Sequence, residues 1–63
     1  MMADEKKVLR LLKTARGQMD GIIKMVEENR YCIDISQQLM ATEAILNRAN
    51  KEILAAHLKH CAQ

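Results

Sequence analysis

Residues 32–61 read CIDISQQLMATEAILNRANKEILAAHLKHC, and the spacing of their apolar side chains decides the fold. Apolar or small residues recur at intervals of 4, 3, 4, 3 and 4 at Ile35, Leu39, Thr42, Leu46, Ala49 and Ile53. This spacing is the heptad pattern of an α-helix that packs along one seam. The stretch is therefore predicted to form one helix from about residue 32 to about residue 61.

The same pattern occurs earlier in the chain. Its members, again at intervals of 4, 3, 4, 3 and 4, are Val8, Leu12, Ala15, Met19, Ile22 and Val26. They predict a first helix over about residues 4–28, with Asp4 as its N-cap. The polar segment EENRY, residues 27–31, interrupts the pattern, and Asp34 then lies near the positive end of the second helix. The prediction is an all-α protein, an antiparallel helical hairpin forming a single helical domain over residues 1–63.

Each predicted helix carries a second apolar stripe. Its residues are Leu9, Leu11, Ile23 and Met25 in the first helix, and Ile33, Met40, Ile45 and Leu54 in the second. A two-helix hairpin covers only one face of each helix, and helices that are apolar on more than one side are buried on several sides. We therefore expect two hairpins to pair as a four-helix bundle.

The composition indicates a small cytoplasmic protein that does not function alone. A chain of 63 residues is near the lower limit for a secure core and usually depends on disulfides, metal or oligomerisation. Its two cysteines are no disulfide framework, and no apolar run is long enough to span a bilayer. The charged segment from Asp4 to Lys7 is unlike a signal peptide. We expect reduced thiols in the cytoplasm.

The C-terminal HLKHC segment places metal-binding side chains on one helical turn. His57 and Cys61 are four residues apart and share a helix face. Cys32 precedes His57 by 25 residues, a separation of about 37 Å along one helix. If two copies of the second helix pack antiparallel, Cys32 of one chain lies beside His57 and Cys61 of the other, giving two equal sites. Two thiolates and one imidazole favour Cu(I), although His60 or water would complete a zinc tetrahedron.

Simpler roles exist for these residues. A lone cysteine such as Cys32 often serves as a small core hydrophobe. A histidine such as His60 near a helix C-terminus often only interacts with the helix dipole. The five methionines are interpreted as core filler or N-terminal residues rather than ligands. Gly17 and Gly21 lie inside the first helical pattern and are interpreted as positions of close helix–helix approach.

Basic charge is concentrated at the start of the first helix. Half of the ten basic residues precede Gly17, namely Lys6, Lys7, Arg10, Lys13 and Arg16. Lys6, Arg10 and Lys13 form one stripe, which symmetry would repeat into a footprint for DNA phosphates. A solvated helix face is the alternative interpretation.

Two segments, RGQMDGIIKMVEENRYCIDISQQLMAT (residues 16–42) and HLKHC (residues 57–61), resemble the copper-sensitive operon repressor family. The RYCID block with H-x-x-x-C is the specific part. The resemblance implies a helical homodimer that pairs into a homotetramer, binds operator DNA when metal-free and releases it on binding Cu(I). It implies Cys32 from one protomer as a ligand with His57 and Cys61 from its partner, and Tyr31 as a neighbouring residue that supports the metal site.

The sequence also departs from that family. Members usually continue into a third helix carrying an acidic residue, which is not present in this chain, and Glu43 occupies a position that is often basic. The predicted function is a Cu(I)-responsive DNA-binding transcriptional repressor that is not an enzyme. The alternative is a copper-binding or persulfide-sensing dithiol protein with weak or no DNA binding.

Overall fold

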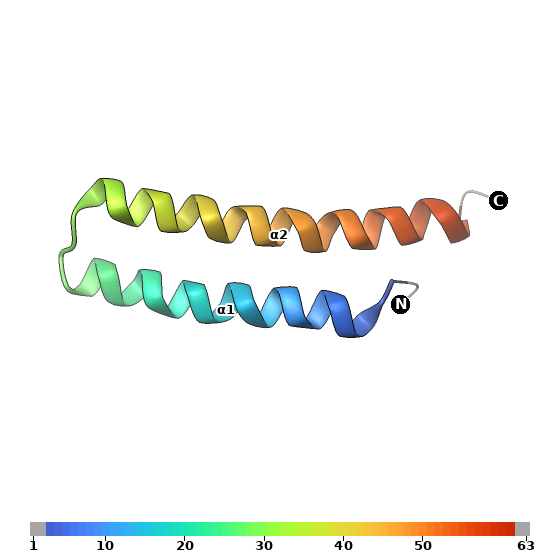
Figure 1. Cartoon of the computed structure of the whole chain (residues 1–63), viewed down its shortest axis with the longest axis horizontal. Helices are drawn as coiled ribbons and strands as arrows, with labels where there is room; N and C mark the ends of the chain where they lie inside the picture. The colour runs from blue at the N-terminus through green and yellow to red at the C-terminus, as the bar shows by residue number, and fades with distance from the viewer. Residues whose placement is uncertain (1–2, 62–63) are drawn as a thin grey trace.

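The computed structural model consists of two long antiparallel helices, α1 (Glu5–Glu27) and α2 (Cys32–Cys61) (Figure 1). It describes the backbone of residues 3–61 and the side chains of residues 3–59. This part of the chain is 50 Å long, 18 Å wide and 11 Å deep, and contains no strand. The predicted all-α hairpin is confirmed, with helix bounds within one residue of those expected from the heptads.

The start of α1 is capped as the sequence predicts. The carboxylate oxygen of Asp4 accepts hydrogen bonds from the backbone N–H groups of Lys6 at 3.1 Å and Lys7 at 3.3 Å. These bonds satisfy two of the N–H groups that the first turn of a helix leaves without partners. Glu5 adds a second negative charge at the positive end of the helix dipole.

The connection between the helices is a Schellman turn. The backbone N–H of Asn29 donates to the carbonyl of Val26, and the N–H of Arg30 donates to the carbonyl of Met25, both at 3.0 Å. This pattern requires a left-handed residue just after the helix, and Asn29 has φ of 53°. Asparagine tolerates that conformation better than other residues with a side chain, so EENRY ends α1 without a glycine.

Within the hairpin, α1 and α2 bury about half of the predicted seam. The buried seam residues are Val8, Ala15, Ile22, Thr42 and Ala49, and Leu11 of the second stripe is buried beside them. Of the other seam residues, Ile35 is half-buried. The rest lie between 38% and 59% exposed; they are Leu12, Met19, Val26, Leu39, Leu46 and Ile53. The contact between two helices is therefore narrower than the seam, and part of each seam stays open to water.

Two polar contacts fix the helices against one another. The Thr42 side chain is 2% exposed, and its hydroxyl donates to the Gln18 side-chain oxygen at 2.7 Å. The Lys7 ammonium lies 2.8 Å from the Glu52 carboxylate. A partly exposed ion pair of this kind contributes about 0.2–1 kcal/mol, whereas the Thr42 bond keeps a polar group satisfied at the centre of the interface.

Gly17 and Gly21 do not mark a close contact between α1 and α2. A Cβ atom built on either residue meets nothing within 4 Å. The interpretation of these glycines as positions of close helix approach is therefore wrong for the hairpin, since neither lies on the side of α1 that α2 covers.

The Schellman turn gives a stability prediction. Asn29→Ala is expected to lower the free energy of unfolding by about 1 kcal/mol, because alanine adopts the left-handed conformation less readily, and Asn29→Gly is expected to preserve or raise it. Asn47→Ala is the matched control in an exposed helical position, where the same substitution is expected to stabilise slightly. Urea unfolding followed by circular dichroism at one fixed protein concentration measures all three. Equal effects of Asn29→Ala and Asn47→Ala would contradict the assignment.

Candidate metal centre and nucleic-acid interface

The exposed half of the seam forms one continuous apolar surface, which we call the open apolar face. It consists of Leu12, Met19 and Val26 of α1 with Leu39, Leu46 and Ile53 of α2. Each of these residues comes four positions after a seam residue that lies in the contact between α1 and α2, as Leu12 does after Val8. Four positions correspond to a rotation of about 40° around the helix axis. Because α1 and α2 run in opposite directions, the same rotation turns both stripes toward the same side of the hairpin.

The candidate metal ligands of α2 lie along this face. Cys32 precedes Leu39 by seven residues, and His57 follows Ile53 by four, so both share the helix side of the open apolar face. Both side chains are exposed, and Cys32 is a free thiol. Their environment therefore changes if a second molecule covers this face.

One chain does not bring the candidate ligands together. Cys32 begins α2, and His57 lies 25 residues later, about 37 Å along the same helix. Within residues 3–59, no three His, Cys, Asp or Glu side chains gather as a metal-binding cluster. The backbone helix includes His60 and Cys61, but their side chains lie outside the described part of the chain.

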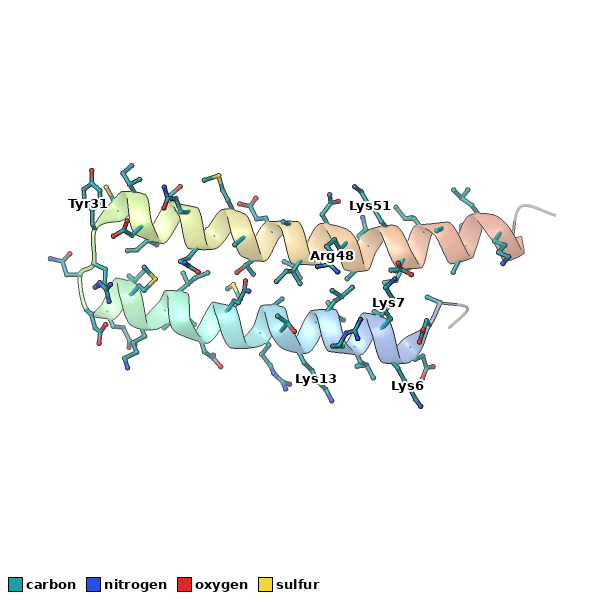
Figure 2. The ribbon with its side chains drawn as sticks, in the orientation of Figure 1. Lys6, Lys7, Lys13, Tyr31, Arg48 and Lys51 are labelled. Atoms are coloured by element: carbon teal, nitrogen blue, oxygen red, sulfur yellow. The ribbon has the colours of Figure 1, made fainter. Side chains whose placement is uncertain are left out.

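Tyr31 lies directly before Cys32 at the start of α2. Its carbonyl accepts the backbone N–H of Ile35 at 3.2 Å, which closes the first helical turn. The phenol is 66% exposed and points away from α1 (Figure 2). The side chain is thus available next to Cys32, on the same end of the hairpin.

The basic stripe of α1 faces outward. Lys6 and Lys13 point away from α2 in Figure 2, and Arg10 occupies the helical position between them. All three side chains are exposed. Arg16, also exposed, lies about a quarter turn away from this stripe, toward the open apolar face.

Lys7 differs from the other basic residues of α1. Its side chain extends toward α2, where it pairs with Glu52 at 2.8 Å (Figure 2). Its charge is therefore partly balanced within the hairpin. The sequence pattern did not reveal this, because Glu52 lies 45 residues further along the chain.

Two basic residues of α2, Arg48 and Lys51, were missed by the sequence reasoning. Arg48 follows Leu46 by two residues and Arg10 precedes Leu12 by two, so each lies on the side of its helix opposite the open apolar face. Both arginines are exposed. The antiparallel arrangement therefore puts basic charge from both helices on the same side of the hairpin, which only the pairing of α1 with α2 reveals.

Comparison with known proteins identifies the family. A family model described as "Metal-sensitive transcriptional repressor" matches residues 4–63. The chain belongs to this family. Membership confirms the resemblance seen in the RYCID and HLKHC segments, and a family of repressors supports the prediction that the protein is not an enzyme.

Several relatives within the family are named copper-sensing transcriptional repressor CsoR. The protein from Mycobacterium ulcerans is 48% identical over 61 residues, covering 95% of this chain and 52% of the relative. The protein from Mycobacterium tuberculosis strain H37Rv is 41% identical over 61 residues, covering 97% of this chain and 51% of the relative. The Bacillus subtilis protein is 36% identical over 58 residues, covering 92% and 57%. The chain thus spans about half the length of these relatives.

Neither α1 nor α2, within residues 3–61, combines the length and apolar character of a membrane-spanning helix.

The open apolar face predicts self-association. Six large apolar side chains between 38% and 59% exposed favour pairing of two hairpins, because contact removes them from water. Sedimentation equilibrium at micromolar concentration is expected to give at least a dimer, and Leu46→Glu is expected to shift it toward monomer. Arg48→Glu, on the side of α2 opposite the open apolar face, is the control and should leave the assembly unchanged. A folded monomeric wild-type chain would contradict the prediction.

Proposed function

We propose that this protein is a Cu(I)-responsive, DNA-binding transcriptional repressor that acts in the cytoplasm as a homodimer or a pair of homodimers. It would bind operator DNA when metal-free and release it when Cu(I) binds. The observation that carries the proposal is the placement of Cys32 and His57 along an exposed apolar face, in a member of a metal-sensing repressor family. The names of the relatives favour copper over the alternative of a persulfide-sensing dithiol protein.

The proposed metal site lies between two chains. Two hairpins pack through their open apolar faces, with the α2 helices antiparallel, so that the start of one α2 lies beside the end of the other. Cys32 of one protomer then joins His57 and Cys61 of its partner, and the two-fold axis produces a second, equal site. Antiparallel pairing is required because about 37 Å of helix separates Cys32 from His57 in one chain.

The donor set fits Cu(I). Two thiolates and one imidazole are soft ligands of the kind that this ion prefers, whereas structural zinc normally takes a fourth ligand. Copper bound there would supply a link between two protomers rather than a catalytic centre. The Tyr31 phenol, next to Cys32 and exposed, is proposed to support the site from the side of the loop.

The proposed DNA-binding surface is the basic side of α1. Lys6, Arg10, Lys13 and Arg16 are proposed to contact phosphates, since all are exposed on α1. Lys7 joins them with a weaker role because Glu52 already balances its charge. Arg48 extends the surface onto α2, on the side of the hairpin away from the proposed dimer contact.

Coupling between copper and DNA follows from differential affinity. A ligand shifts a conformational equilibrium only if it binds one conformation more tightly. Copper would hold the start of one α2 and the end of the other at one spacing, and the rigid helices would carry that constraint to the basic surfaces. Pairing of dimers into a tetramer is proposed to use the outer apolar stripe of α2, which contains Ile33, Met40, Leu54 and Leu58, all exposed.

The phosphate contacts predict a change in salt dependence. Lys13→Ala with Arg16→Ala is expected to weaken DNA binding and to flatten the plot of log affinity against log salt, because each lost contact reduces its slope by about 0.9. Fluorescence anisotropy with a labelled operator duplex over a KCl series measures this. Lys7→Ala is the matched control and should change the slope less, since Glu52 already holds its ammonium. An unchanged slope in the double variant would place the binding surface elsewhere.

The shared site predicts complementation between defective chains. Cys32→Ser and Cys61→Ser homodimers are each expected to lose tight Cu(I) binding. A heterodimer of the two regains one intact site, built from the Cys32 that remains in one chain with His57 and Cys61 of the other. Anaerobic Cu(I) titration against a chelator is expected to give about one tight ion per heterodimer, against two per wild-type dimer. Circular dichroism verifies folding, and folded heterodimers without a tight site would refute the inter-chain arrangement.

A further inference from the structure

The side of α2 that carries the candidate ligands also carries two polar side chains in the middle of an apolar surface. Glu43 follows Leu39 by four residues, and Asn50 follows Leu46 by four, so both border the open apolar face. Both are exposed in the hairpin. A polar pair midway along α2, at the edge of a surface that would otherwise pack through leucine and isoleucine, requires an explanation.

We propose that Glu43 of one chain and Asn50 of a second copy form a hydrogen-bonded pair on each side of the two-fold axis, and that this pair fixes the antiparallel register of α2 against α2. The proposal rests on the proposed dimer. Its role is positional: the pair would hold the helices where Cys32 meets the end of the partner helix. Glu43, a departure from a position that is often basic in the family, thereby gains a role outside the DNA surface.

The spacing along α2 carries the argument. Glu43 lies 11 residues after Cys32, and Asn50 lies 11 residues before Cys61. When Cys32 is level with Cys61 of an antiparallel partner, Glu43 is therefore level with Asn50 of that partner, and the reverse pair forms by symmetry. Leu46, 14 residues after Cys32 and 15 before Cys61, then lies beside its own copy near the axis. Apolar residues meet apolar residues, and polar residues meet polar ones.

Other registers lose this match. A slip of one heptad in one direction places Glu43 against Glu43 of the partner, where two carboxylates repel. A slip in the other direction places Asn50 against Asn50 and leaves Glu43 level with His57. A parallel arrangement also puts each residue beside its own copy. Among these arrangements, only the unshifted antiparallel one places an Asn50 amide beside each Glu43 carboxylate.

The chemistry of the pair suits a register device. The side-chain N–H of asparagine donates to the glutamate carboxylate, and such charge-assisted bonds are stronger than neutral ones. Burying a carboxylate without a hydrogen-bond donor costs free energy. A shifted register that leaves Glu43 without a donor is therefore less stable than the same shift would be between purely apolar helices. Single polar residues at core positions of helical assemblies set register in this way, at some cost in stability.

Charge substitution at position 50 tests the pairing in the metal-free chain. Asn50→Lys faces Glu43 of the partner with an opposite charge and is expected to lower the dimer dissociation constant by about tenfold. Asn50→Asp faces it with a like charge and is expected to raise the constant by about tenfold. Ala41→Lys and Ala41→Asp are the controls, since Ala41 is exposed and precedes Arg48 by seven residues, on the side of α2 opposite the open apolar face. Sedimentation velocity over a concentration series measures all four, with helicity followed by circular dichroism.

A double variant with the charges restored distinguishes loss of pairing from loss of folding, in case Asn50→Asp weakens folding. Glu43→Lys combined with Asn50→Asp restores opposite charges across the axis and is expected to recover the dimer that Asn50→Asp loses. No recovery, or equal shifts from lysine and aspartate at position 50, would overturn the proposal. Shifts of the same size at position 41 would also overturn it, because the effect would then reflect net charge.

Cross-linking distinguishes antiparallel from parallel pairing of the two α2 helices. In a Cys61→Ser chain, the two Cys32 thiols of an antiparallel dimer lie at opposite ends, so a short bismaleimide is expected to yield little covalent dimer. Glu43→Leu with Asn50→Leu in that background removes the discrimination against the parallel arrangement and is expected to raise the yield several-fold. An unchanged yield from a folded dimer would refute the role of the pair in excluding parallel packing. These measurements need neither copper nor DNA, so the register and the repressor function fail independently.

Discussion

The structure depends on one packing constraint, which is that a pair of helices covers only one side of each helix. The contact between α1 and α2 buries Val8, Ala15 and Ile22 of the first seam, while Leu12 and its equivalents remain open to water. These residues belong to the same heptads, and the rotation between them is small. The hairpin thus has a second apolar side that α1 and α2 leave uncovered. We propose that another copy of the chain covers it, with apolar burial as the driving force.

In the proposed function, the length of α2 would convert this constraint into a mechanism for sensing. A helix of 30 residues acts as a spacer that keeps Cys32 away from the candidate ligands at its other end. A small ion therefore cannot be held by these residues within a single chain. In an antiparallel pair, the same length brings opposite ends together, and metal affinity becomes linked to how two hairpins are arranged. This linkage is what a repressor needs, because a ligand that prefers one arrangement shifts the population toward it.

Much of the fold could be predicted from the sequence because its signals are local. Heptads give the helices, and the position of Asp4 gives the cap. The sequence could not tell which seam residues pack inside the hairpin, because neighbouring heptad columns differ by only a small rotation. It gave no indication that Lys7 pairs with Glu52, a contact between residues distant in the chain. Of the candidate site, the structure places Cys32 and His57 on one exposed side of α2, and the assignment of these residues as ligands stays a prediction.

The candidate metal ligands and the candidate DNA-binding residues lie on different sides of the hairpin. Apolar residues and candidate ligands occupy one side, whereas Arg10 and Arg48 lie on the opposite side, with basic charge from both helices. In the proposed function, a copper ion at the first side would not compete with DNA phosphates for the same atoms. Communication between the sides would then pass through the positions of whole helices, which the bond of Thr42 to Gln18 links within the hairpin. A small change in the angle or spacing of two hairpins would then alter the distance between their basic surfaces, and the fixed spacing of DNA phosphates would make that change decisive for binding.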